Sequence, residues 1–378
     1  MAAIICMHED RTECLTGVKL GILSLRRHSP SLGIVLNSPT APPAFVEWAR
    51  RIPQLTLASY TDIRDHGWNM KPHMLLRLLQ EGHPEVIWMD ADIIAHRDVL
   101  TPLTQLAPEV LVATQETYWG QSQGGTERTR AWGFTPGRVL PCTVNSGVLR
   151  VTTKHLGLLK AWESLLQHPL YRRAQSLPWY ERPLHMISDQ EVLTGMLGAE
   201  EFSSTPLCLL KRGSDIAQCM GPGGFTPTER IRSIAKGLPG LVHSMAIKPW
   251  MKESRPPALN INARSLRRYY EYLHMELTPY ASVARSYASE LDEDVQWLDL
   301  NSRVSKLLAI VTGNSAVLRE LPLSIVDSLA RRWRRWRGVA RYELNEEFCL
   351  TESPLGQASP PGHFHRESHS DGSHHLHA

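Results

Sequence analysis

The chain has 378 residues, of which 42% are apolar and 21% charged, and its formal net charge is +3. This length predicts one large domain with an appendage, or two domains. The small net charge, without a basic face or a recognisable module in the first 300 residues, argues against a nucleic-acid-binding protein. We expect a cytoplasmic protein, because the six cysteines form no CxxC pair and suit a reducing compartment, and because neither a signal peptide nor an apolar stretch of about 18 residues is apparent.

The first 115 residues alternate short apolar runs with helical patterns. We expect strands at 2–7, 33–36, 55–59, 86–89 and 110–114, and helices at 13–27, 42–51, 71–80 and 99–106. This alternation predicts an α/β fold with a mostly parallel central sheet and helices on both faces. In such sheets ligands bind beyond the C-terminal ends of the strands.

The remaining elements complete a catalytic domain that we assign to residues 1–255. We expect a loop over the site at 118–141, a strand at 145–151, a helix at 155–167, irregular chain at 178–187, a helix at 189–197, a loop at 220–228 and a closing segment at 241–250. Residues 256–350 are predicted to form a C-terminal helical extension with helices at 263–277, 300–311 and 316–336. The Pro-, Ser-, Gly- and His-rich residues 351–378 are predicted to be a disordered tail.

Two carboxylates, Asp90 and Asp92, directly follow the apolar run 86–89. A chain that leaves a buried strand can aim both at one hard cation, and Mg²⁺ or Mn²⁺ prefers such oxygen ligands and shares its shell with phosphates. The metal would neutralise a departing pyrophosphate. The alternative is a solvated turn or a helix cap.

His243 ends another apolar stretch, and Lys248-Pro249-Trp250 follows it. A neutral imidazole can complete a metal shell that already holds two carboxylates, and a nearby lysine can pair with a phosphate. The alternative is a core histidine and a surface lysine.

Three further motifs carry side chains suited to a sugar or a phosphate. Asn145 precedes Gly147, and its amide can donate to and accept from sugar hydroxyls, unless the motif is only a turn that enters a strand. Asp189 and Gln190 could contact the transferred sugar, or merely begin a helix. Lys71 opens a helix whose N-terminus favours anions such as a donor phosphate, unless it is a surface lysine.

In this order and spacing the motifs resemble the retaining glycosyltransferases of family 8, such as glycogenins and bacterial lipooligosaccharide galactosyltransferases. The resemblance covers residues 1–255. It is carried by Lys71 through Asp90-Ala91-Asp92 to Asp98, by Asn145-Ser146-Gly147, by Asp189-Gln190, and by His243 with Lys248-Pro249-Trp250. The family usually has a Gly where this chain has Ala246, and one more residue between the His and the Lys.

The resemblance implies a GT-A (Rossmann-like) fold and a Mn²⁺ (or Mg²⁺) ion. It also implies transfer of a hexose, with retention, from a nucleotide-diphosphate sugar, usually a UDP-sugar, to an acceptor hydroxyl. The implied metal ligands are Asp90, Asp92 and His243. The residues implied to contact the donor are Lys71, Asp90, Lys248 and His8. Those implied to face the sugar or acceptor are Asn145, Asp189 and Gln190.

The sequence does not name the acceptor, which could be a glycan, a lipid, a protein or a small molecule. Two other functions stay open. A sugar nucleotidyltransferase also uses a metal, although it usually carries a Gly-rich basic loop after the first strand, which residues 7–12 do not provide. A non-catalytic GT-A scaffold that binds a partner has no need of a metal shell.

The stretch from Ala316 to Arg337 is amphipathic and ends in Arg-Arg-Trp-Arg-Arg-Trp-Arg. Arginines and tryptophans on such a helix suit peripheral contact with an anionic membrane, which would fit a lipid-linked acceptor. The alternative is a helix that packs on the catalytic domain and carries its arginines favourably at its C-terminus.

Overall fold

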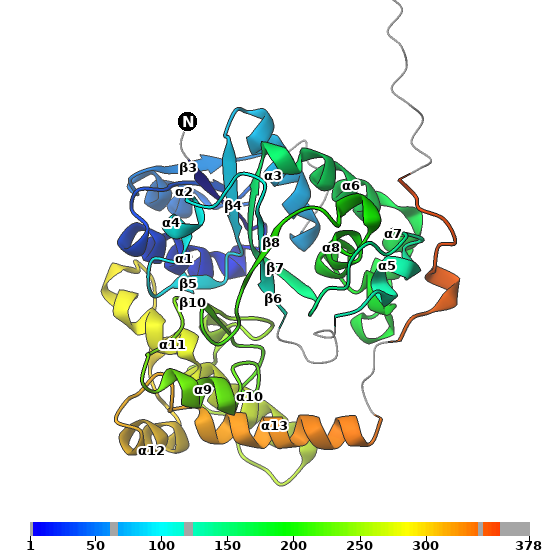
Figure 1. Cartoon of the computed structure of the whole chain (residues 1–378). Coiled ribbons are helices and arrows are strands. Elements are labelled where there is room, and N and C mark those ends of the chain that lie inside the picture. The colour runs from blue at the N-terminus through cyan, green and yellow to red at the C-terminus, as the bar shows by residue number, and fades with distance from the viewer. Residues whose placement is uncertain (1–2, 61–66, 117–123, 339–342, 356–378) are drawn as a thin grey trace, which may run out of the picture.

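The computed structural model describes residues 3–60, 67–116, 124–338 and 343–355. A seven-stranded sheet, ordered β3-β2-β1-β4-β7-β6-β8, forms its centre (Figure 1). Its strands are β1 Ile4–His8, β2 Gly33–Asn37, β3 Leu55–Ala58, β4 Glu85–Met89, β6 Leu111–Gln115, β7 Val144–Thr152 and β8 Leu207–Leu210. Neighbouring strands are parallel except at β7, which runs antiparallel to β4 and to β6. The predicted mostly parallel α/β sheet is therefore confirmed.

The strands are apolar on both faces because each face packs against helices. On β1, Ile5 and Met7 belong to one hydrophobic core, whereas Cys6 between them belongs to the other. The first core is covered by α1 Leu15–His28 and α2 Pro43–Arg50. The second is covered by α3 Met70–Gln80, α6 Leu156–Gln167 and α8 Asp189–Leu197.

A second sheet of three short strands lies beside the first. It consists of β5 Ile93–Ala95, β9 Ile216–Gln218 and β10 Leu241–His243. Strand β10 is parallel to β9 and antiparallel to β5, with His243 paired to Ile93. This pairing brings the end of β10 next to Asp92, 151 positions earlier in the chain.

Several short elements differ from the expectations. Helix α5 Glu127–Ala131 lies in the expected loop at 118–141, of which residues 118–123 fall outside the described residues. The sequence did not predict β5, β8, β9, α7 Pro169–Gln175 or α9 Pro227–Ser233. Each is three to seven residues long, too short to show a period. The predicted helix at 99–106 is the single turn α4 Leu100–Leu103.

The C-terminal residues form α10 Ala263–Leu277, α11 Pro279–Ala284, α12 Arg303–Val311 and α13 Leu321–Trp336. Helix α11 packs into the first core through Tyr280, Ala281 and Ala284. After α13 the chain returns to the second core, where Phe348 is buried and its carbonyl oxygen lies 3.1 Å from Nε2 of His185. The predicted helical extension therefore packs on both cores. Of the tail predicted to be disordered, residues 356–378 lie outside the described residues.

Candidate metal and donor site

The polar side chains of interest lie at one edge of the central sheet. Parallel strands end at the same edge, so His8 at the end of β1, Asp90 after β4 and Glu116 after β6 are brought to it together. The antiparallel β7 begins at this edge, which adds Asn145 and Ser146. One edge thus collects residues from five separate sequence segments once β10 and its His243 are counted.

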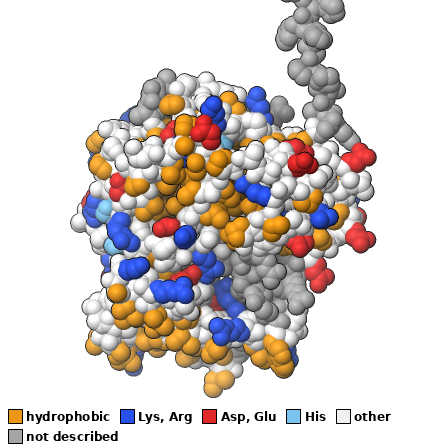
Figure 2. All heavy atoms as spheres, viewed as in Figure 1, with side chains coloured by type: hydrophobic (Ala, Val, Ile, Leu, Met, Phe, Trp, Pro, Cys, Tyr) orange, Lys and Arg blue, Asp and Glu red, His pale blue; other side chains and the backbone are white. Residues whose placement is uncertain are grey.

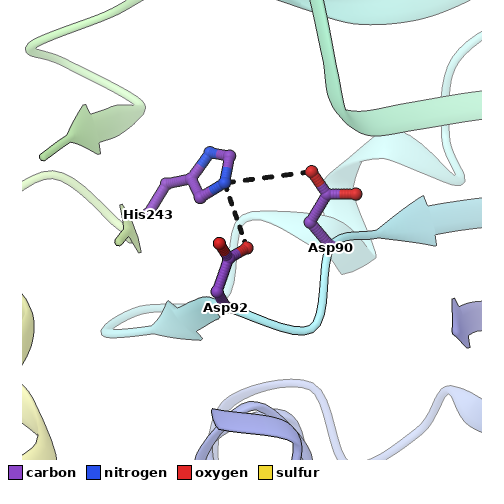
Figure 3. Close-up of side chains that lie close together, drawn as sticks. All are labelled: Asp90, Asp92 and His243. Carbon is purple, nitrogen blue, oxygen red and sulfur yellow. Dashed lines mark ion pairs between the residues drawn. The ribbon is translucent and has the colours of Figure 1, made fainter. Parts of the chain in front are cut away.

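Three of these side chains form a candidate metal site. The Nε2 atom of His243 lies 3.1 Å from Oδ1 of Asp92 and 3.8 Å from Oδ2 of Asp90. All three ligand atoms lie within 4.8 Å of one another. The three side chains point toward a common centre, the aspartates from the link between β4 and β5 and the histidine from the end of β10 (Figure 3).

Backbone hydrogen bonds fix the two loops that carry these residues. The amide of Asp90 donates to the carbonyl of Gly147 at 2.8 Å, and the amide of Ser244 donates to the carbonyl of Asp92 at 2.9 Å. A Cβ on Gly147 would lie 2.9 Å from Cε1 of His243 and 3.2 Å from Oδ2 of Asp90. Glycine is required there because the backbone passes directly against the cluster.

The two oxygens of Asp90 have different surroundings. Oδ1 accepts a hydrogen bond from the indole nitrogen of Trp88 at 2.7 Å and lies 3.2 Å from Nζ of Lys71. Oδ2 faces His243. Trp88 is buried, so its indole fixes the carboxylate and leaves one oxygen directed at the candidate metal position. Sequence reasoning assigned Trp88 only to the strand.

Lys71 is buried rather than on the surface, so the surface-lysine alternative is wrong. Its ammonium donates to Oγ of Ser146 at 2.7 Å and lies 3.6 Å from Oδ2 of Asp189, which also accepts from Ser146 at 2.7 Å. Burial alone would lower the pKa of Lys71, but Asp189 and Asp90 raise it overall. Burial raises the pKa of Asp189, and Lys71 offsets only part of that rise. Ser146 and the two charged groups form one sealed network.

Lys248 approaches the cluster from the other side. Its ammonium forms an ion pair with Oδ2 of Asp92 and donates to the carbonyl of Ser244 at 2.7 Å. Burial would raise the pKa of Asp92, but Lys248 and His243 outweigh it and hold that pKa well below its usual range. Ala246, which lies between His243 and Lys248 in the sequence, adopts φ +63°, in the left-handed region that favours glycine. This explains physically why a glycine is expected at this position.

Two of the predicted sugar-side residues, Asn145 and Gln190, form a second network with Glu116, whereas the third, Asp189, belongs to the network of Lys71. Asn145 donates to Oε2 of Glu116 at 3.0 Å and to Oε1 of Gln190 at 3.1 Å, and its own Oδ1 accepts from the amide of Gly147 at 2.9 Å. Gln190 donates to the same Glu116 oxygen at 2.6 Å. Sequence reasoning missed Glu116, although a carboxylate directly after an apolar strand was a signal that could have found it.

His8 lies at the end of β1 and contacts the neighbouring strand. Its Nδ1 is 3.1 Å from the side-chain nitrogen Nδ2 of Asn37 on β2, and its Nε2 is 3.6 Å from a carboxylate oxygen of Asp10. Burial lowers the pKa of His8 and outweighs the opposing influence of Asp10.

Asp98, the last residue of the lysine-to-aspartate motif, accepts from Ser29 and from the amide of Thr101 instead of joining the cluster.

Comparisons with known proteins give structural neighbours alone. No protein-family model matches the chain, and no curated protein matches it. The apo form of the glycosyltransferase GlyE of Streptococcus pneumoniae TIGR4 is 16% identical with a TM-score of 0.44, over 77% of this chain and 64% of that one, so this chain spans about two thirds of its length. The galactosyltransferase LgtC in complex with donor and acceptor sugar analogs is 16% identical with a TM-score of 0.40, over 73% of this chain and 95% of that one. The bifunctional glycosyltransferase WbbM is 12% identical with a TM-score of 0.43, over 75% and 51%.

Proposed function

We propose that this chain is a metal-dependent glycosyltransferase that moves a hexose from a nucleotide-diphosphate sugar to an acceptor hydroxyl. The resemblance of the motifs implies that the donor is a UDP-sugar and that the metal is Mn²⁺ or Mg²⁺. It also implies that the transfer retains the configuration of the sugar. The observation that carries the proposal is the convergence of Asp90, Asp92 and His243 from two distant segments, with their ligand atoms within 4.8 Å.

The residues present fit a divalent cation. Ligands about 2.1 Å from an octahedral ion and at right angles to each other lie about 3.0 Å apart, and opposite ligands about 4.2 Å. Nε2 of His243 lies 3.1 Å from an oxygen of Asp92 and 3.8 Å from an oxygen of Asp90, and both separations fall between these two values. Three protein ligands leave positions open for phosphate oxygens. A metal held there supplies positive charge that stabilises a departing diphosphate.

The chain's own residues then hold the donor in place. Lys248 already lies against Asp92 and is positioned to pair with a diphosphate as a point charge. His8, at the neighbouring strand end, is assigned to the nucleotide side. Lys71 acts indirectly, since it is sealed between Asp90 and Asp189 and orients both.

The sugar side consists of Asn145, Asp189 and Gln190. Because the amide groups of Asn145 are all engaged within the protein, we assign it the role of positioning Gln190 and Glu116. Gln190 is only partly buried and is the member of this group placed to meet the sugar or the acceptor. Catalysis would depend on positioning and on electrostatic stabilisation of the leaving group.

Calorimetric titration of UDP, GDP, ADP and CDP, each with and without Mn²⁺, tests the proposal without knowledge of the acceptor. We expect UDP to bind only in the presence of the metal, and Asp92→Asn to abolish that binding. Asp299→Asn is the matched control, because it removes one carboxylate charge at an exposed position in the C-terminal region. It should bind UDP as the unmodified chain does.

A different diphosphate that binds with metal would keep the transferase and change the donor. If none of the four binds under any condition, the transferase proposal fails and a partner-binding scaffold becomes the better explanation. If Asp92→Asn binds UDP as well as the control does, the assignment of the metal ligands fails.

A further inference from the structure

Large apolar side chains are exposed mainly in one part of the molecule. Among the described residues, 20 large hydrophobic side chains are exposed, and 12 of them lie between residues 259 and 336. They are Leu259, Ile261, Leu266, Val304, Leu307, Ile310, Val311, Ile325, Val326, Leu329, Trp333 and Trp336. Figure 2 shows apolar side chains gathered along the lower end of the molecule, where Figure 1 places α12 and α13.

The segments that carry these side chains share one small core. Helices α10, α12 and α13 pack on one another through a cluster that includes Leu273, Leu308 and Leu323. The exposed faces of these three helices therefore belong to one packed unit. We call residues 255–268, α12 and α13 together the basal surface.

Helix α13 has an anchored side and an open side. On the anchored side, Asp327 accepts from the amide of Gly223 at 2.9 Å, and Arg331 donates to the carbonyl of Met220 at 2.9 Å. On the open side, Leu329 is 59% exposed and Trp336 is 82% exposed. The helix thus makes polar contacts with the catalytic part on one side, whereas the side chains of its apolar stripe, spaced three to four residues apart, are 44% to 82% exposed.

The charges of the basal surface are mostly positive. Its three segments contain ten Lys or Arg residues and one acidic residue, Asp327, which is already paired with Arg331, and Arg337 directly follows α13. Two of the basic residues, Arg267 and Arg268, pair with acidic residues just outside the segments. Arg332, Arg334 and Arg337 are exposed around the tryptophans, and the guanidinium of Arg337 lies 4.6 Å from the ring centre of Trp333. Arginine beside exposed tryptophan and aliphatic side chains is the composition of an interfacial membrane-binding surface.

We propose that the basal surface binds the surface of an anionic lipid bilayer. A second copy of this chain is a poor occupant, because two such surfaces would bring their basic residues face to face. A bilayer with anionic headgroups matches the charge and accepts the apolar side chains below them. Within the described residues no helix is long and apolar enough to cross a membrane, so the contact proposed is peripheral.

Binding to a bilayer would also define the acceptor of the proposed transferase. The membrane contact itself does not depend on that function, whereas the identity of the acceptor does. The anchored side of α13 holds the loop at 220–224, and that loop follows Cys219, whose amide donates to the carbonyl of His243 at 2.7 Å. The basal surface is therefore linked to the candidate metal site by two contacts, one from Arg331 of α13 to Met220 and one from Cys219 to His243. The acceptor class inferred is a glycan or hydroxyl on a lipid.

Cosedimentation of the full chain with vesicles tests the surface directly. Vesicles of phosphatidylcholine with about one third phosphatidylglycerol are compared with pure phosphatidylcholine, at low and at high salt. We expect binding to the anionic vesicles at low salt, weaker binding at high salt, and little binding to the neutral vesicles.

Two variants of the basal surface separate charge from apolar contact. The triple variant Arg332→Glu, Arg334→Glu and Arg337→Glu should lower the partition coefficient by at least about 100-fold, since each basic residue near the surface contributes roughly fivefold. The double variant Trp333→Ala and Trp336→Ala should lower it by about tenfold or more. Tyr180→Ala and Lys160→Glu are the matched controls, because both side chains are exposed on the catalytic part, and they should bind as the unmodified chain does.

All the substituted side chains are exposed, and a thermal melt of each variant checks that it is folded. No binding at low salt, or equal binding by all variants, would overturn the proposal. A chain that ignores vesicles but forms dimers in sedimentation velocity, which the tryptophan variant disrupts, would assign the surface to a second copy instead. None of these outcomes depends on metal or nucleotide, so failure here leaves the calorimetric test of the transferase unaffected.

Discussion

Trp88→Phe tests whether a buried indole sets the orientation of Asp90. The substitution removes the hydrogen bond of 2.7 Å to Oδ1 but keeps an aromatic ring in the core. A hydrogen bond to a charged group contributes about 1.5–3 kcal/mol. Loss of a partner of a metal ligand typically lowers metal affinity about 10–100-fold, which is about 1.4–2.8 kcal/mol. The two estimates agree, so we expect the Kd for Mn²⁺ to rise 10–100-fold. Binding should survive, because Lys71 still lies 3.2 Å from the same oxygen.

The assay is a Mn²⁺ titration followed by the electron paramagnetic resonance signal of the free ion. Trp132→Phe is the matched control, since this buried indole donates to the carbonyl of His185 at 3.1 Å, away from the cluster. Both variants lose one buried indole hydrogen bond, and only Trp88→Phe should lose metal affinity. An unchanged Kd in Trp88→Phe, or an equal rise in both variants, would refute the positioning role.

Three further substitutions test neighbouring features. Gly147→Ala would place a Cβ 2.9 Å from Cε1 of His243 and should lower the affinity for Mn²⁺ at least about tenfold. Gly33→Ala is the control and should leave the affinity unchanged, because its Cβ would lie 3.7 Å from the nearest atom. Equal affinities of the two variants would contradict the close approach. Ala246→Gly relieves φ +63° and should raise the free energy of unfolding in urea by about 1 kcal/mol, and a decrease would show that the alanine is not strained. Burial raises the pKa of Glu191 from 4.5 to about 7, so between these values the folded protein keeps a proton that the unfolded chain has released. Stability should therefore fall by about 3 kcal/mol as pH rises through this window, and urea titrations of Glu191→Gln should lack that fall; an identical pH profile would count against it.

The sequence predicted those parts of the fold that have a long period or a clear punctuation. Helices α8 and α10 begin and end where their patterns do, because each starts at a capping residue, Ser188 and Asn262. The central strands were predictable from apolar runs buried on both faces. From those strands follows the position of Asp90 at a sheet edge, which is a local inference.

The second sheet was not predictable, because its strands have three residues each. Its pairing is nevertheless what places His243 beside Asp92. The burial of Lys71 was hidden for a related reason. A lysine at a helix start is ordinarily exposed, and only the fold brings Asp189 from another helix to compensate it. The sequence thus named the members of the site, whereas their contacts depend on pairings between distant segments.

The charges of the assembled site explain why its two lysines differ. Asp90, Asp92 and Asp189 contribute three negative charges, and Lys71 and Lys248 contribute two positive charges. Lys71 contacts three groups of the protein, namely Ser146, Asp90 and Asp189. We therefore expect Lys71 to keep these contacts whether or not a ligand is bound. Lys248 is held by one carboxylate and one carbonyl. A divalent cation would change the net charge of this group from −1 to +1 and compete for the carboxylate that Lys248 holds. Under the proposed function, this charge change would favour joint binding of the cation and a diphosphate, with which Lys248 could pair in place of the carboxylate of Asp92.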